Sequence, residues 1–425
     1  MLARKLSLVA AFALWILLLA ILLGSPPVAL AAVPVALYLA FVTLGSRPHL
    51  DVTATRLLPS GQVYEGERVT VTLRVKNEGP RTDLEVVDGV PPEISISGGS
   101  NHVFAVLEEG ECRDFGYSFS PESFGSYSFG PIRIRSSDLA SARYEETVTE
   151  SYESLRVYPE IKYLNRIDLR QTRPRNWPGE TSVRRPGQGL EFYGIGEYRA
   201  GDPLRRVNWR ASARAGHLML NQFMNEAGGE TVLVLDLRST SRIGTPPNTC
   251  ADYSVRAAAA LSHRLLRDRN RVGLLAVGQR IIKVPPGFGR RQFERILVGL
   301  ISTKVGVDAW NLELVPYYLS LFYSRMVQLV LISPLVDSSP MFMVSELARR
   351  GYEVLVISPS PLEIDIPEKG DPRAIRIARE LAALERDAKI SSLRKHAKVI
   401  DWNPRLPLVD AFEGLRESWR VRRPG

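Results

Sequence analysis

The stretch Val232-Leu233-Val234-Leu235-Asp236-Leu237-Arg238-Ser239-Thr240-Ser241 places an apolar run directly before a turn that is rich in hydroxyl groups. A run without alternation is typical of a strand that is buried on both faces. Similar runs follow at 272–277, 327–332, 354–357 and 398–400, and helix-like stretches occur at 253–267, 291–300, 341–350 and 372–395. This alternation predicts a doubly wound, mostly parallel α/β sheet over 229–402, in which ligands collect at the carboxyl ends of the strands.

Upstream of this sheet, the region 49–158 changes to a period of two. Val69, Val71, Leu73 and Val75 alternate with polar residues, which indicates a strand with one buried and one wet face. Further short runs follow, with turn signals between them and no helical stretch. We predict an all-β, immunoglobulin-like sandwich that serves either as a spacer or as a binding module.

The N-terminal region, 1–48, contains two charge-free apolar stretches, 6–23 and 28–44, separated by Gly24-Ser25-Pro26-Pro27. Each has roughly the length that crosses about 30 Å of hydrocarbon, so we predict a two-helix transmembrane hairpin. The positive-inside rule then predicts a multi-pass cell-membrane protein with two spans, whose N-terminus and soluble domains are cytoplasmic. A cleaved signal peptide is the alternative, because 29–31 resembles a cleavage site.

The composition excludes several classes of protein. The chain has 425 residues and a net charge of +9, and its two cysteines are far apart and outside any Cys/His cluster, which excludes a disulfide scaffold and a zinc knuckle. The five histidines are scattered, and neither a nucleophile elbow nor a Walker loop occurs. We therefore expect no enzyme activity.

A basic segment, 159–228, joins the two predicted domains. Between positions 160 and 214 it holds twelve Lys and Arg residues against six Asp and Glu. Its core, 198–214, reads Tyr-Arg-x-Gly-Asp-x-x-Arg-x-x-x-Trp-x-x-Ser-Ala-Arg, and Asp202 before Pro203 is typical of a helix start. The candidate residues for binding a partner or an anion are Tyr198, Arg199, Asp202, Arg205, Arg206, Trp209, Ser212 and Arg214.

Two interpretations of this core remain open. The arginines can form an open site for carboxylates or phosphates. Alternatively, Asp202 and Glu197 pair with the arginines while Tyr198 and Trp209 pack against the next sheet, which makes the segment a structural clasp. The mixture of aromatic residues with both signs of charge favours the clasp.

The run from Arg185 to Glu226 closely resembles the signature of the DUF58 family, membrane proteins named for a domain of unknown function. The resemblance implies that the C-terminal domain is similar to von Willebrand factor type A. It also implies a MoxR-type AAA+ ATPase as partner, with a role in the assembly or maturation of membrane or envelope complexes.

Metal-binding von Willebrand type A domains carry Asp-x-Ser-x-Ser after the first strand, with a Thr and an Asp from later loops. The matching candidates here are Asp236, Thr240 and Asp337, but Arg238 stands at the position of the first serine. A positive charge at a ligand position describes a degenerate site. No cofactor is secure, and magnesium is the candidate that the resemblance leaves open.

The function predicted from all of this is a membrane-anchored, non-enzymatic interaction scaffold. The alternatives are a metal-dependent, adhesion-type ligand binder that faces outward and an envelope-linked hydrolase. Membrane lipid is a second predicted partner, through the basic segment and the basic tail, 403–425. No recognised nucleic-acid module accompanies the basic residues, so no specific nucleic acid is expected.

Overall fold

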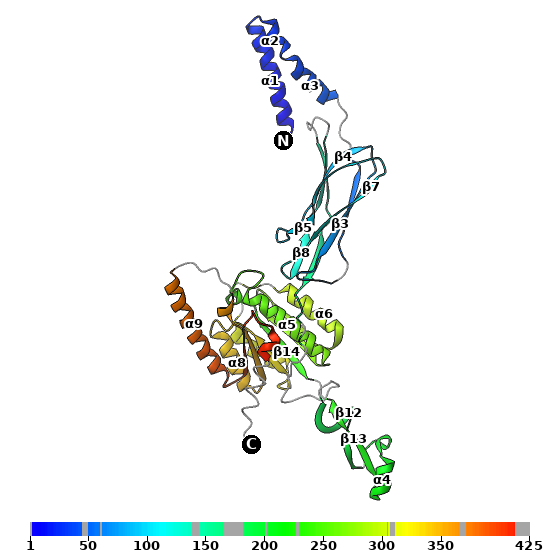
Figure 1. Cartoon of the computed structure of the whole chain (residues 1–425), viewed down its shortest axis with the longest axis vertical. Helices are drawn as coiled ribbons and strands as arrows, with labels where there is room; N and C mark the ends of the chain where they lie inside the picture. The colour runs from blue at the N-terminus through cyan, green and yellow to red at the C-terminus, as the bar shows by residue number, and fades with distance from the viewer. Residues whose placement is uncertain are drawn as a thin grey trace. The chain divides into compact units, whose positions relative to one another are not determined.

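The computed structural model separates the chain into two compact units, Met1–Val157 and Tyr158–Gly425 (Figure 1). The residues it describes are 2–44, 50–59, 62–137, 144–162, 164, 182–199, 202–226, 229–303, 305–306, 311–364 and 371–412. Most of the predicted basic tail, 413–425, therefore lies outside the described residues.

The N-terminal helices correct one prediction. A turn at Ala31 and Ala32 divides the expected second span between α2 (Pro26–Leu30) and α3 (Val33–Leu44). The twelve residues of α3 rise only about 18 Å, whereas the hydrocarbon layer is about 30 Å thick. With α1 (Leu2–Leu22) included, the described part of the chain has no helix that is long and apolar enough to cross a membrane. The predicted two-helix transmembrane hairpin is therefore wrong.

Strands make up the rest of the first unit. Two four-stranded sheets have antiparallel pairing throughout, and a third sheet has three strands. In spatial order they are β1 (Val52–Leu57), β3 (Val69–Asn77), β7 (Cys112–Phe119), β5 (Ile96–Gly99); β10 (Tyr144–Thr149), β9 (Ile132–Ser137), β4 (Thr82–Asp88), β6 (His102–Leu107); and β2 (Val63–Tyr64), β11 (Glu153–Tyr158), β8 (Gly125–Phe129).

One apolar core serves these sheets. The alternation predicted from Val69 to Val75 is present in β3, where these valines and Leu73 are buried. They pack in one cluster with Phe119 and Phe129.

The second unit contains an antiparallel hairpin, β12 (Ser182–Glu197) and β13 (Met219–Glu226). The connection between its strands contains a short 3₁₀ helix, η1 (Leu204–Arg206), and the helix α4 (Trp209–Ala215). The predicted signature core is this connection.

A six-stranded sheet follows, in the order β16-β15-β14-β17-β18-β19, and all of its pairs are parallel except the edge pair β15–β16. Each of the five predicted strands is present. The elements are β14 (Glu230–Asp236), η2 (Ser239–Ser241), α5 (Cys250–Arg267), β15 (Arg271–Val277), β16 (Ile281–Gly287), α6 (Gly289–Ser302), η3 (Leu312–Leu314), α7 (Val315–Phe322), β17 (Gln328–Ile332), α8 (Ser339–Arg349), β18 (Glu353–Pro359), η4 (Pro361–Glu363), α9 (Pro372–Leu393) and β19 (Lys398–Trp402).

Helices cover both faces of this sheet. Leu275 and its same-face neighbours form a core with α7, α8 and the C-terminal end of α9. Leu274 points to the opposite face, where it lies beside Gly299 of α6. All residues of β14 are buried, because helices cover both faces of the sheet. This burial explains the unbroken apolar run from which the strand was predicted.

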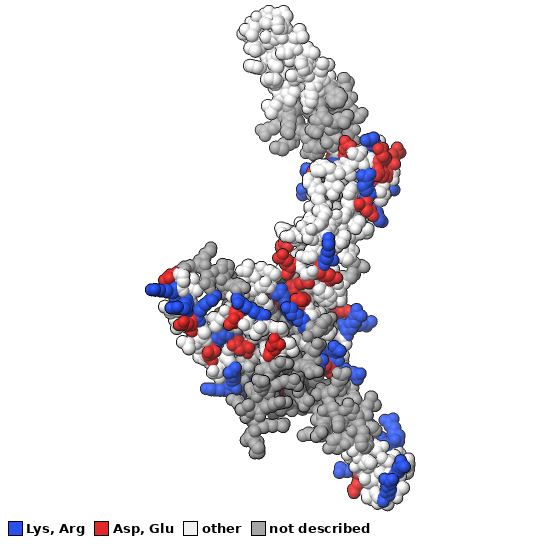
Figure 2. Space-filling view, in the orientation of Figure 1, with Lys and Arg blue, Asp and Glu red and all other residues white. Residues whose placement is uncertain are grey.

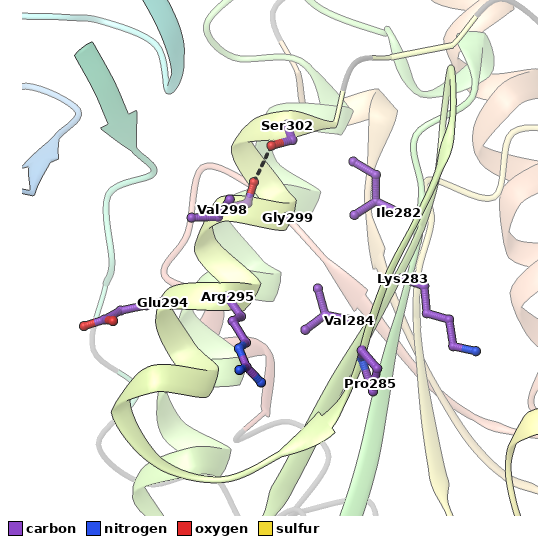
Figure 3. A pocket seen from close by; sticks show the side chains of 9 residues that line it. All are labelled: Ile282, Lys283, Val284, Pro285, Glu294, Arg295, Val298, Gly299 and Ser302. Carbon is purple, nitrogen blue, oxygen red and sulfur yellow. Dashed lines mark hydrogen bonds between the residues drawn. The ribbon is translucent and has the colours of Figure 1, made fainter. Parts of the chain in front are cut away.

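An open groove of about 600 Å³ lies between β16 and α6 (Figure 3). Ile282, Val284 and Val298 line it, and Arg295 and Glu294 add two charges from α6. The hydroxyl of Ser302 donates to the backbone oxygen of Val298 at 2.6 Å. The lining brings together no nucleophile and base, so the groove offers no catalytic arrangement.

Candidate functional site

The signature helix α4 is held by local hydrogen bonds. Asn208 caps its N-terminus, because its side-chain oxygen accepts from the backbone N–H of Ala211 at 3.0 Å. The side-chain nitrogen of Asn208, Nδ2, donates to Asn221 Oδ1 on β13 at 2.8 Å. Gly216, at φ 72°, ends the helix in the left-handed conformation that glycine adopts without strain. The helix is therefore fixed on the hairpin at its N-terminal end.

Ser212 connects the same two elements from the middle of the helix. Its buried hydroxyl donates to the backbone oxygen of Asn208 and accepts from the backbone N–H of Met219, each at 2.8 Å. This predicted binding residue therefore has a structural role, because both sides of its hydroxyl are used within the hairpin.

Asp202 also acts locally, but not as the helix cap that the sequence predicts. Its carboxylate accepts from the backbone N–H of Arg199 at 2.9 Å and closes a turn before Pro203. The backbone N–H of the neighbouring Tyr198 donates to the backbone oxygen of Leu218 at 2.9 Å. The helix itself begins later, after Asn208.

Several exposed residues of this segment make up what we call the Trp209 face. Trp209 is 69% exposed and Leu204 is 64% exposed. Four arginines of the same segment are exposed as well, Arg199, Arg205, Arg210 and Arg214. Figure 2 shows basic side chains gathered at the end of the hairpin that carries α4.

This surface differs from the predicted clasp. Most of the Trp209 side chain is exposed, whereas the clasp interpretation places it against a sheet. Within the described ranges, none of the four arginines has an ion pair with a carboxylate. Glu197, which the clasp interpretation pairs with an arginine, instead has its Oε1 3.7 Å from Nε2 of His217. The fifth arginine, Arg206, is half-buried. Positive charge and apolar area are therefore both presented to solvent, as in the open-site interpretation.

The second candidate cluster lies at the carboxyl end of the sheet. Arg238 donates from Nε to Asp236 Oδ1 at 2.9 Å and from Nη2 to Asp236 Oδ2 at 3.0 Å. The same guanidinium donates to both carboxylate oxygens of Asp337, at 2.8 and 2.9 Å. Ser333 Oγ donates to Asp236 Oδ2 at 2.8 Å. The structure thus brings Asp236 and Asp337 together, with a guanidinium between them.

The ionisation of this cluster follows from the pairing. Burial would raise the pKa of Asp337, but the hydrogen bonds and the charge of Arg238 hold that pKa below its usual range. For Arg238, burial lowers the pKa, and the bonds from both carboxylates outweigh burial and raise it. Asp337 and Arg238 therefore form an ion pair at neutral pH.

These residues do not fit the magnesium ion that the resemblance left open. Arg238 already binds all four carboxylate oxygens, so a cation would have to compete with a guanidinium for each of them. The third predicted ligand, Thr240, has a buried hydroxyl without a hydrogen-bond partner. Among the described residues, no group of three or more His, Cys, Asp or Glu could hold a metal ion.

The loop that carries Asp337 is also held from α9. The buried guanidinium of Arg386 donates to the backbone oxygen of Pro334 at 2.9 Å, and Lys389 Nζ donates to that of Val336 at 2.6 Å. Between these contacts Leu335 has φ 57°, a conformation that costs a non-glycine residue free energy. Two side chains of α9 therefore hold the loop, one bond on each side of Leu335 along the chain.

Both clusters lie in the part of the chain that the family comparison covers. Residues 195–396 match the family described as "Protein of unknown function DUF58". The DUF58 match begins in β12, includes α4 and the Arg238 cluster, and ends after α9.

The curated relatives are themselves uncharacterized. Protein Rv1480 of Mycobacterium tuberculosis is 34% identical over 119 residues, which are 28% of this chain and 37% of that protein. This chain thus spans well under half the length of that relative. Protein YeaD of Bacillus subtilis is 22% identical over 274 residues, 63% of this chain and 66% of that protein.

Solved structures resemble the chain only weakly. An aerotolerance-related membrane protein from Bacteroides fragilis has 13% identity and a TM-score of 0.30, with 46% of this chain and all of that chain covered. A FixG-related protein from Vibrio parahaemolyticus has 15% identity and a TM-score of 0.18, over 24% of this chain and 95% of that chain.

Several residues of these clusters were missed at the sequence level. The role of Asn208 could have been predicted, since an Asn directly before a short helical stretch is a typical N-cap. Ser333 and Arg386 gave no comparable signal, because their partners, Asp236 and Pro334, are 97 and 52 positions away.

Proposed function

We propose that this chain is a non-enzymatic interaction scaffold whose Trp209 face binds an anionic protein partner. The proposal is carried by one observation: Trp209, Arg210 and Arg214 are exposed on the capped helix α4, and Arg199, Leu204 and Arg205 are exposed in the segment before it. Trp and Arg are the residues that dominate binding free energy at protein interfaces. A surface already fixed by Asn208 and Ser212 loses little conformational entropy when it binds.

The proposed partner is a MoxR-type AAA+ ATPase, and the proposed role is the assembly or maturation of larger complexes. This partner comes from the DUF58 resemblance. The basic charge of the Trp209 face supports it to the extent that the docking surface of the ATPase is acidic, because opposite charges accelerate encounter and select partners.

We further propose that the α/β body is similar to von Willebrand factor type A and binds partners without a metal. The guanidinium of Arg238 supplies the positive charge that a cation would bring to Asp236 and Asp337. Strand-end loops of such a body are the usual place for ligands.

Binding of a purified MoxR-type AAA+ ATPase from the same organism to the full chain tests the proposal. We expect Trp209→Ala to weaken binding about thirtyfold, as for a central interface anchor. We expect Arg210→Ala to weaken it less and to reduce its dependence on salt. The matched controls, Leu321→Ala and Arg290→Ala, change residues that are also exposed but lie on α7 and α6. Equal affinity of wild type and Trp209→Ala would refute this docking surface.

A further inference from the structure

The N-terminal part of α9 is packed only lightly: Ile375, Ala382 and Ala383 are half-buried, and the other residues from 372 to 385 are exposed. Asp371 caps the helix, and its carboxylate accepts from the backbone N–H of Arg373 at 3.1 Å. The first fourteen residues, 372–385, contain no buried side chain, whereas Arg386, Ile390 and Leu393 are buried against the body. Fourteen residues extend the helix by about 21 Å. An isolated helix of that length is only marginally stable in water, so a packing partner would stabilise it.

This exposed part carries a regular apolar stripe, which we call the Leu381 stripe. Its members are separated by three and four residues in turn, the spacing that gives one face of a coiled coil. Ile377 and Leu381 are each 56% exposed and Leu384 is 69% exposed. Ala374 and Ala388 continue the stripe at either end and are exposed as well. Burying these three large side chains against a partner would remove apolar surface from water, which favours association.

The flanks of the stripe are mainly acidic. Glu380, Glu385 and Asp387 occupy the positions beside it that face a partner helix in a coiled coil, and all three are exposed. Arg373 is the basic flanking residue, at the N-terminal end. A partner with the complementary pattern therefore has an apolar stripe between Lys or Arg residues.

The flanks also decide between occupants. A parallel pair of two α9 helices would place Glu380 of one copy against Glu385 of the other, which is a repulsive contact. An anionic bilayer is disfavoured by the carboxylates beside the stripe, because the exposed Arg376 and Arg379 lie on the far side of the helix, whereas helices on such surfaces carry Lys and Arg beside their apolar face. Both arguments favour a basic helix from another protein.

We propose that the Leu381 stripe binds an amphipathic helix with basic flanks, supplied by a protein partner. The surface uses none of the residues of the Trp209 face, so this inference stands independently of the proposed function. Its charge is opposite to that of the Trp209 face, which would let the chain hold two chemically different partners.

Two synthetic helices test the proposal. Both carry leucine at the stripe positions over about four heptads; one has lysine and the other glutamate at the flanks. Fluorescence anisotropy with the full chain should show that the lysine peptide binds at least about tenfold more tightly than the glutamate peptide. The double variant Leu381→Gln/Leu384→Gln should lose at least about tenfold in affinity for the lysine peptide.

Matched variants control this test. Leu321→Gln changes a leucine of α7 that is 80% exposed and should leave the affinity unchanged. Glu380→Lys/Glu385→Lys should reverse the preference between the two peptides, and circular dichroism should show that each variant keeps its helix content. Amide exchange should slow in α9, and not in α7, when the lysine peptide is added.

Four results would overturn the proposal. They are equal binding of both peptides, an equal loss of affinity in Leu321→Gln, concentration-dependent dimers that disappear in the double leucine variant, and binding of phosphatidylglycerol vesicles through the same leucines. The third would assign the stripe to a second copy, and the fourth to a lipid surface.

Discussion

Arg238 and Asp236 lie two residues apart at the end of β14 and are joined by two side-chain hydrogen bonds, at 2.9 and 3.0 Å. The side chain of Asp236 is only 1% exposed, and Arg238 is its ion-pair partner. Because Arg238 also binds Asp337, the pair connects the end of β14 to the loop after β17. The guanidinium thus holds the two carboxylates next to each other at the carboxyl end of the sheet.

The first prediction concerns this pair. Arg238→Met leaves the carboxylate of Asp236 buried without its counter-charge, and removal of one member of a buried pair costs about 3–5 kcal/mol. Urea unfolding followed by circular dichroism should show that loss. Arg290→Met is the matched control, because Arg290 and Glu294 form a surface pair, 88% and 43% exposed, for which we expect a change of about 0–1 kcal/mol. Equal unfolding midpoints for both variants would contradict the prediction.

The second prediction is a pH dependence at Asp337. Its pKa is lowered in the folded protein, so its contribution to stability is fully present above the unfolded value of about 3.9 and is lost as the pH falls through the lower folded value. Asp337→Asn should therefore be less stable than wild type at neutral pH, and the difference should shrink as the pH falls below about 3.9. Urea midpoints of both proteins across this range measure it. A difference that stays constant with pH would exclude the ionised Asp337 as its source.

The outcome at particular elements shows what could be predicted from the sequence. The strand at β14 was predicted because burial on both faces leaves an unbroken apolar run. The edge strand β16 was missed, because Pro285 and Pro286 interrupt its pattern, and prolines are tolerated only at such edges. The hairpin prediction failed because hydropathy counts apolar residues and does not register the turn at Ala31 and Ala32.

The Arg238 cluster and the Trp209 face could be predicted only in part. The proximity of Asp236 and Arg238 follows from their spacing at a strand end. Their contact with Asp337 joins positions 99 residues apart and depends on the parallel pairing of β14 with β17. The exposure of Trp209 could not be predicted either, since an aromatic residue beside arginines is compatible with packing and with binding.

The third prediction concerns a buried hydroxyl in the first unit. Tyr117 donates to Asp88 Oδ2 at 2.6 Å, and Asp88 is also paired with the buried Arg56. Burial, together with the bond to Asp88, raises the pKa of Tyr117, so the hydroxyl remains a donor at neutral pH. Tyr117→Phe should cost about 1.5–3 kcal/mol in the urea unfolding of this unit. Tyr152→Phe, at a position 66% exposed, should cost almost nothing, and a similar loss in both variants would refute the assignment.

The fourth prediction tests the support of the Trp209 face. Ser212→Ala leaves the backbone N–H of Met219 without the hydroxyl that accepts from it. We expect a local loss of about 1–3 kcal/mol, seen as faster amide exchange at Met219 and in α4. Arg214→Ala removes an exposed side chain from the same helix and should leave this exchange unchanged. Unchanged protection of Met219 in the serine variant would show that the hydroxyl does not hold the helix.

The last prediction compares two glycines of the first unit. Gly99 and Gly110 have nearly the same left-handed conformation, φ 73° and 76°. A Cβ at Gly99 would lie 2.2 Å from the backbone oxygen of Gly116 and 2.9 Å from Cα of Tyr117, whereas a Cβ at Gly110 would meet open space. Gly110→Ala should therefore cost only the conformational strain, about 1–2 kcal/mol. Gly99→Ala should cost more, because the pairing of β5 with β7 must also open. Thermal or urea unfolding of both variants measures the difference, and equal losses would mean that β5 can move away from β7 without cost.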